Sequence, residues 1–173
     1  MNKTEIYAQA LADVRATLDD VTDPLTLLST VTAVVHQALP YASWTGFYLV
    51  RAPRLLRVGP YQGPVACLEV PFDRGVCGAA ARERRSQVVP DVHAFPGHVA
   101  CDAAARSEVV VPVDDARGNL YGVLDLDSHQ EASFDEEDRR GLEAIVEWLS
   151  PRLTVTDIGC VDPTRHTPGP SAG

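Results

Sequence analysis

The 173-residue sequence lacks any apolar run that approaches the roughly 20 residues needed to span a bilayer. Its first residues include an acid and no hydrophobic segment of the kind that a secretory signal needs, so we expect a cytoplasmic protein. Basic residues are scarce, because 15 Lys and Arg stand against 24 Asp and Glu, for a formal charge of −9. An acidic chain repels phosphate backbones and anionic membrane surfaces, so we expect neither a nucleic-acid nor a membrane partner.

The sequence is also poor in cysteine and has no C-x-x-C pair, which excludes a zinc ribbon and a thioredoxin motif. It holds four cysteines: Cys67, Cys77, Cys101 and Cys160. In a reducing cytoplasm they should rest as thiols, so any disulfide would be transient and tied to function. The alternative is that they are structural thiols buried in the core. His93, His98 and Cys101 match no closed ligand pattern, so we predict no metal site and no cofactor.

Helical periodicity is present at both ends of the chain. Asn2 and Glu5 have the spacing of a capping box, and Asp23-Pro24 is typical of a second helix start. The second helix is predicted to bury one apolar stripe: Leu25, Leu28, Val31, Val35 and Leu39. A last helix is predicted to open at a capping box of Ser133 and Glu136. Its inner stripe is Leu142, Ile145, Val146 and Leu149.

Strand-like segments fill the middle of the chain, around one short helix at 76–83. The predicted strands are 43–50, 54–59, 66–70, 86–89, 108–113 and 120–127. This order predicts an α+β domain with one mainly antiparallel sheet of about six strands, flanked by N- and C-terminal helices. We place the domain at residues 1–153 and predict a disordered tail at 154–173, which is rich in Pro, Thr and Gly.

Cys101 lies in the irregular segment 90–106, which is too long for an ordinary turn, and such loops often carry function. A loop can expose a thiol for nucleophilic attack. His98 would favour the thiolate if protonated, whereas a carboxylate of Asp102 facing the sulfur would oppose it. Either Cys67 or Cys77 could condense with an oxidised Cys101 to protect it as a disulfide. The alternative is that both fill space in the core.

Three acids are predicted to share one face of the sheet. Asp125 and Asp127 lie two residues apart on one strand, and Glu108 opens the neighbouring strand. Crowded carboxylates form a receptor for an ammonium group, and their raised pKa values would let one of them donate a proton. The alternative is a solvated acidic face. Trp44 and Tyr48 would form an aromatic wall suited to a small cation with a sulfoxide, or would simply pack the sheet.

These residues stand in longer motifs: WTGFYL at 44–49, GPYQG at 59–63, RGVCG at 74–78, FPGHVACD at 95–102, SEVVVP at 107–112 and GVLDLDS at 122–128. With them the chain resembles the free methionine-(R)-sulfoxide reductases, which are catalytic GAF-domain proteins. The resemblance implies a GAF fold and the thiol-dependent reduction of free L-methionine (R)-sulfoxide. It also implies a thioredoxin-type dithiol as the reductant, and a homodimer formed through the N-terminal helices.

The resemblance assigns roles to the matched residues. Cys101 matches the catalytic cysteine, and Cys67 its partner in the recycling disulfide. Cys77 matches a third cysteine that shuttles the disulfide or is auxiliary. Three acids match positions that hold the substrate and assist at the sulfoxide: Glu108, Asp125 and Asp127. Two aromatic residues match positions that line the pocket: Trp44 and Tyr48.

Two other functions fit the same sequence. One is a GAF sensor module that binds a small ligand without consuming it; because the chain ends shortly after its last predicted helix, we expect no output domain. The other is a redox switch whose disulfide regulates a partner protein. Turnover of methionine sulfoxide with a dithiol would separate an enzyme from both.

Overall fold

The computed structural model describes residues 1–97 and 101–155. In them one six-stranded sheet has the order β3-β2-β1-β6-β5-β4, and every neighbouring pair is antiparallel. The strands are β1 (Trp44–Ala52), β2 (Leu55–Gln62), β3 (Glu69–Pro71), β4 (Gln87–Val89), β5 (Ser107–Asp114) and β6 (Leu120–Ser128). The four α-helices of this part are α1 (Lys3–Leu18), α2 (Pro24–Ala38), α3 (Gly75–Glu83) and α4 (Glu136–Leu149). The predicted α+β class is confirmed.

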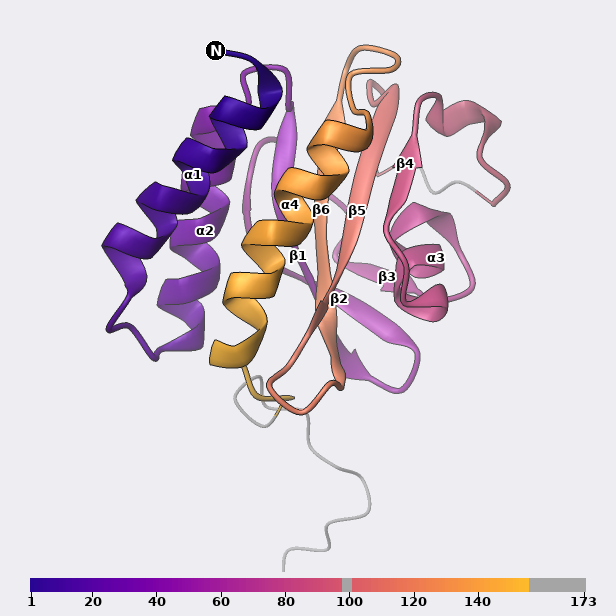
Figure 1. Cartoon of the computed structure of the whole chain (residues 1–173). Coiled ribbons are helices and arrows are strands. Elements are labelled where there is room, and N and C mark those ends of the chain that lie inside the picture. The colour runs from indigo at the N-terminus through magenta and orange to yellow at the C-terminus, as the bar shows by residue number, and fades with distance from the viewer. Residues whose placement is uncertain (98–100, 156–173) are drawn as a thin grey trace, which may run out of the picture.

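The helices lie on opposite faces of the sheet (Figure 1). α1, α2 and α4 cover one face, where the larger apolar core takes in the inward side chains of the central strands. α3 packs on the other face, over a second cluster that contains Trp44, Tyr48 and Cys77. The alternation along β6 divides its side chains, because Leu124 and Leu126 enter the first core. Asp125 and Asp127, which alternate with these leucines, therefore face α3.

The N-terminal helix pair begins where the sequence predicts. The Asn2 side chain accepts from the backbone N–H of Glu5, and the Glu5 carboxylate accepts from the Asn2 backbone N–H, which completes the capping box. Asp23 caps α2 by accepting from the N–H of Thr26, with Pro24 as the first helical residue. Both caps satisfy backbone donors that a helix start would otherwise leave without a partner.

Three predicted details are wrong. Leu25 is 66% exposed, since the buried stripe of α2 begins at Leu27 and Leu28. The capping box of α4 is formed by Asp135 and Asp138, and the Asp135 carboxylate accepts from the first N–H groups of the helix. The Ser133 hydroxyl instead donates within the turn before the helix. β3 spans Glu69–Pro71, so the segment before it, which carries Cys67, is irregular.

A buried carboxylate joins the two ends of the domain. Asp138 in α4 is fully buried and accepts hydrogen bonds from Tyr7 of α1 and from Tyr41 just before β1. The ammonium of Lys3 pairs with the same carboxylate. Because a buried charge is tolerated only when it is paired and hydrogen-bonded, this cluster holds α1 against α4.

The C-terminal boundary is described only in part. Thr154 and Val155 follow the last turn, η2 (Ser150–Arg152), and the N–H of Val155 donates to Asp115. The rest of the predicted tail, with Cys160, lies outside the described residues, so the boundary at 153 stays a prediction. Within the described part, no helix combines the length and the apolar character needed to cross a membrane.

Candidate active site

A cavity lies between α3 and the sheet. Most of the residues singled out in the sequence line it together: Tyr48, Cys77, Cys101, Glu108, Asp125 and Asp127. Trp44 and Cys67 are not among its lining residues, but each contacts one, since Trp44 stacks on Tyr48 and Cys67 is bonded to Cys101. The structure therefore brings all eight predicted site residues to one place.

The register of three strands sets the acids side by side. Glu108 of β5 lies directly opposite Asp127 of β6, and Asp125 lies opposite Gly46 of β1. Directly opposed residues have Cβ atoms about 5 Å apart, so side chains on one face are within contact distance. Glu108 and Asp125 are 7% and 4% exposed, which excludes the alternative of a solvated acidic face.

The aromatic wall stands beside the acids. Trp44 is stacked between Tyr48 and Tyr61, with ring centroids 5.6 and 5.4 Å away. Gly46 makes this stack possible, because a Cβ there would lie 2.4 Å from the Cβ of Tyr61 and 2.6 Å from the Trp44 ring. Tyr61 was not identified from the sequence, although the GPYQG motif contains it. The Tyr48 hydroxyl donates a hydrogen bond to the Cys67 carbonyl, which attaches the segment that carries Cys67 to the aromatic wall.

A disulfide joins Cys67 to Cys101, with 5.0 Å between their Cα atoms and a sequence separation of 34. It differs from the resting thiols expected in a reducing compartment, so the structure represents the oxidised form. His98 lies outside the described residues. The Asp102 carboxylate accepts from the N–H of Ala104 and pairs with His129 at 2.8 Å, and the first of these bonds lowers its pKa most. These two contacts stabilise the ionised form of the Asp102 carboxylate.

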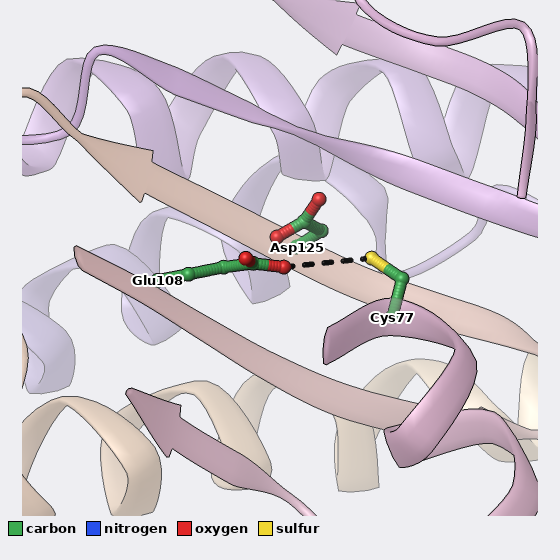
Figure 2. A group of neighbouring side chains, drawn as sticks. All are labelled: Cys77, Glu108 and Asp125. Carbon is green, nitrogen blue, oxygen red and sulfur yellow. Dashed lines mark hydrogen bonds between the residues drawn. The ribbon is translucent and has the colours of Figure 1, made fainter. Parts of the chain in front are cut away.

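Cys77, near the start of α3, is buried and carries a free thiol. Its Sγ lies 3.9 Å from Oε1 of Glu108 (Figure 2). Burial, followed by the charges of Asp125 and Glu108, raises the pKa of this thiol well above its usual value. Cys77 is thus a neutral thiol at neutral pH and a poor nucleophile as it stands.

Burial also keeps the carboxyls protonated to higher pH than usual. It raises the pKa of Asp125 to about 7, although hydrogen bonding with Cys77 and Glu108 acts in the other direction. Burial and then the Asp125 charge raise the pKa values of Glu108 and Asp127 well above the normal range. Three neighbouring carboxyls cannot all ionise in a space that water has left. The site can therefore contain an ionised carboxylate and a protonated carboxyl at the same time.

We expect the stability of the wild-type protein, relative to Asp125→Asn, to fall as pH rises from 5 to 7. The folded protein keeps a proton on Asp125 that the unfolded chain has lost above its pKa of 3.8. The contribution of this group is therefore complete below about pH 4 and disappears as pH passes through about 7, at about 1 kcal/mol per pH unit. Urea unfolding of both proteins at pH 5, 6 and 7 measures this difference.

Taking the difference between the two proteins removes the titrations of groups that do not interact with Asp125, including that of His36, whose pKa is lowered by burial. The exposed acid Glu131 supplies the control, because Glu131→Gln should leave the pH dependence of the wild type unchanged. Parallel curves for wild type and Asp125→Asn would show that Asp125 ionises normally.

Sequence reasoning missed the remaining lining residues of the cavity. They come from β3, from the first turn of α3 and from the loop before β5: Val70, Gly75, Val76, Asp102 and Ala105. Their types, mostly small or apolar, do not distinguish them from core residues. Among the described lining residues there is no Lys, Arg or His. The acids of the cavity thus face no protein cation there.

Comparison with known proteins adds to this geometry. A family model described as the GAF domain matches residues 21–150, which include every strand of the sheet. The chain is 41% identical over 157 residues to the free methionine-R-sulfoxide reductase of Escherichia coli (strain K12), covering 91% of this chain and 94% of that protein. It is 36% identical over 156 residues to the free methionine-R-sulfoxide reductase of Saccharomyces cerevisiae (strain ATCC 204508 / S288c), covering 87% of each.

Among solved structures, the chain is similar to the free methionine-R-sulfoxide reductase of Neisseria meningitidis, which was determined in complex with its substrate. The TM-score is 0.84 at 39% sequence identity, and the match covers 91% of this chain and 92% of that one. The similarity therefore extends over most of both chains.

Proposed function

The chain belongs to the GAF-domain family and, within it, to the free methionine-(R)-sulfoxide reductases, and from this premise we propose that it reduces free L-methionine (R)-sulfoxide to L-methionine. The observation that carries the proposal is the convergence of a disulfide-bonded cysteine pair and three acids, two of them buried, on one cavity. A cytoplasmic location would supply the thiol reductant that such chemistry needs.

The acids divide the work between binding and proton donation. Asp125, whose pKa is raised to about 7, carries a negative charge for much of the time at neutral pH and receives the ammonium of the substrate. Glu108 and Asp127, whose pKa values burial raises further, stay protonated. One of them gives its proton to the sulfoxide oxygen, which makes that oxygen a better leaving group.

The Cys101 thiolate then attacks the substrate sulfur. The S–O bond breaks, the oxygen passes with the donated proton to Cys101 as sulfenic acid, and methionine is released. The sulfur of the substrate is reduced by two electrons and that of Cys101 is oxidised by two. Cys67 condenses with the sulfenic acid, releasing water and forming the disulfide that the structure contains. A thioredoxin-type dithiol exchanges with this disulfide and restores both thiols.

Selection of the free amino acid follows from the charge of the cavity. A methionine sulfoxide within a peptide has no ammonium group, so Asp125 would remain without a cation in a buried site. Tyr48 lines the cavity on the side of β1, and Trp44 stacks on the Tyr48 ring and supports it there. Both features favour a small zwitterion over a chain segment.

The test is an assay of free methionine sulfoxide, supplied as separate R and S epimers, with DTT as reductant. We expect methionine to form from the R epimer at a rate at least about 100-fold above that from the S epimer, because a chiral site can align the sulfoxide oxygen of only one epimer with its proton donors. N-acetyl-methionine sulfoxide, which lacks the ammonium, is the matched control and should react poorly. Binding of the R epimer without methionine release would instead support a sensor.

A further inference from the structure

Three potential metal ligands from three elements meet in the cavity. The thiol of Cys77 in α3, the carboxylate of Glu108 in β5 and that of Asp125 in β6 each offer one ligand atom, and these atoms all lie within 4.8 Å of one another. Figure 2 shows the three side chains pointing toward one another from their separate elements. All three residues are buried, so the cluster is no ordinary exposed group of acids.

A second observation is that one oxygen atom of this cluster lacks a hydrogen-bond partner. Oδ1 of Asp125 is completely buried and has no hydrogen-bond partner among the described residues. A buried acceptor without a partner destabilises the fold, and the described lining of the cavity supplies no basic side chain to relieve it. The position therefore calls for a cation or a donor from outside the chain.

We propose that Cys77, Glu108 and Asp125 form a binding site for a thiophilic divalent cation such as Zn²⁺. Tetrahedral zinc holds sulfur at about 2.3 Å and carboxylate oxygen at about 2.1 Å, so its ligand atoms lie about 3.5 Å apart. The observed 3.9 Å between Cys77 Sγ and Glu108 Oε1 is close to that separation. One thiolate with two carboxylates favours Zn²⁺ over Mg²⁺ and Ca²⁺, which prefer all-oxygen sites.

Binding would displace protons from the ligands. The cation takes the place of the thiol proton of Cys77 and of any proton on the two carboxyls, and these protons pass to solvent. Cys77 is the third residue of α3, so the positive end of the helix dipole also faces the thiolate that forms. Water completes the coordination.

The oxidised form has room for an ion. The cavity has a volume of about 30 Å³, which is enough for an ion with a water molecule. The cation would occupy the carboxylates that receive the substrate ammonium. Competition with substrate is a consequence that rests on the proposed function, whereas binding itself does not.

No sequence motif announces this site. Cys77 and Glu108 are 31 residues apart, and Asp125 lies on a further strand, so the spacing resembles no metal motif. The prediction of no metal site, made from His93, His98 and Cys101, concerned other residues. The packing of α3 against the sheet brings the three residues together.

The test titrates the full oxidised chain with Co²⁺, in a Cys160→Ser background that leaves Cys77 as the one free thiol. We expect one Co²⁺ per chain and a thiolate-to-cobalt charge-transfer band in the near ultraviolet. Zn²⁺ should displace the Co²⁺, and Mg²⁺ at the same concentration should not. Cys77→Ala should abolish the band, and Asp125→Asn should weaken Co²⁺ binding by at least about tenfold, as the loss of a ligand requires.

Cys77→Ser serves as a second variant of nearly the same size, and it too should lose the band. Far-UV circular dichroism confirms that the variants are folded, and Glu131→Gln, an exposed acid away from the cavity, should bind Co²⁺ like the parent. Absence of the band in the parent, or a band that survives both Cys77 substitutions, overturns the proposal. Because no substrate is used, a chain that binds Co²⁺ but fails the epimer assay keeps this inference and loses the proposed function, and the converse also holds.

Discussion

Replacing Cys101 by serine is expected to slow single-turnover reduction of free methionine (R)-sulfoxide by at least about 10³-fold. Serine keeps the size of the side chain but offers a neutral hydroxyl where the reaction needs a thiolate. The acids of the cavity would remain, so substrate binding should survive while methionine formation stops. Pre-reduced protein mixed with one equivalent of substrate, followed by chromatography of methionine, measures the effect.

Cys160→Ser provides the matched control, because it makes the same chemical change at a cysteine outside the described residues. Its single-turnover rate should equal that of the wild type. Binding of the R epimer by the Cys101→Ser variant, followed calorimetrically, separates lost chemistry from a lost fold. If Cys101→Ser forms methionine at the wild-type rate, another group is the nucleophile and the assignment is wrong.

The strand-borne half of the site follows from periodicity alone. Alternation along β6 predicts that Asp125 and Asp127 face away from Leu124 and Leu126, and the structure confirms it. The same argument correctly sets Trp44 and Tyr48 on one face of β1. A period of two is a local property, so it needs no knowledge of the distant chain. The predicted helix caps at Asn2 and Asp23 are local in the same sense and are also confirmed.

The remainder of the site depends on contacts that no local pattern contains. The disulfide between Cys67 and Cys101 joins two segments that are 34 positions apart in the chain, and residue-based reasoning left Cys67 and Cys77 as equal alternatives. The placement of Cys77 beside Glu108 depends on how α3 docks on the sheet. The cap of α4 also depends on competition between polar groups, because the Ser133 hydroxyl donates within the preceding turn and Asp135 caps the helix. Long-range docking and competition between polar groups are tertiary effects.

Replacing Cys67 by serine is expected to leave one turnover and remove the rest. The fully reduced variant should release about one methionine per chain, because Cys101 and the acids are intact, and then stop with Cys101 as sulfenic acid. Trapping with dimedone and mass spectrometry should find the adduct on Cys101. Steady-state turnover with a thioredoxin-type protein should drop to the background rate, whereas DTT, which reduces sulfenic acid directly, should restore part of it.

Cys77→Ser distinguishes the two resolving thiols. Cys77 is buried, and burial with neighbouring acids raises the pKa of its thiol well above the usual value, so little thiolate is available to attack the sulfenic acid. Cys67 is half-buried on an irregular segment and already bonded to Cys101 in the oxidised form. The Cys77→Ser variant should therefore retain steady-state turnover with a thioredoxin-type protein, even if the rate of its first turnover falls. If Cys67→Ser recycles normally and Cys77→Ser does not, the disulfide in the structure is a side product and Cys77 is the resolving cysteine.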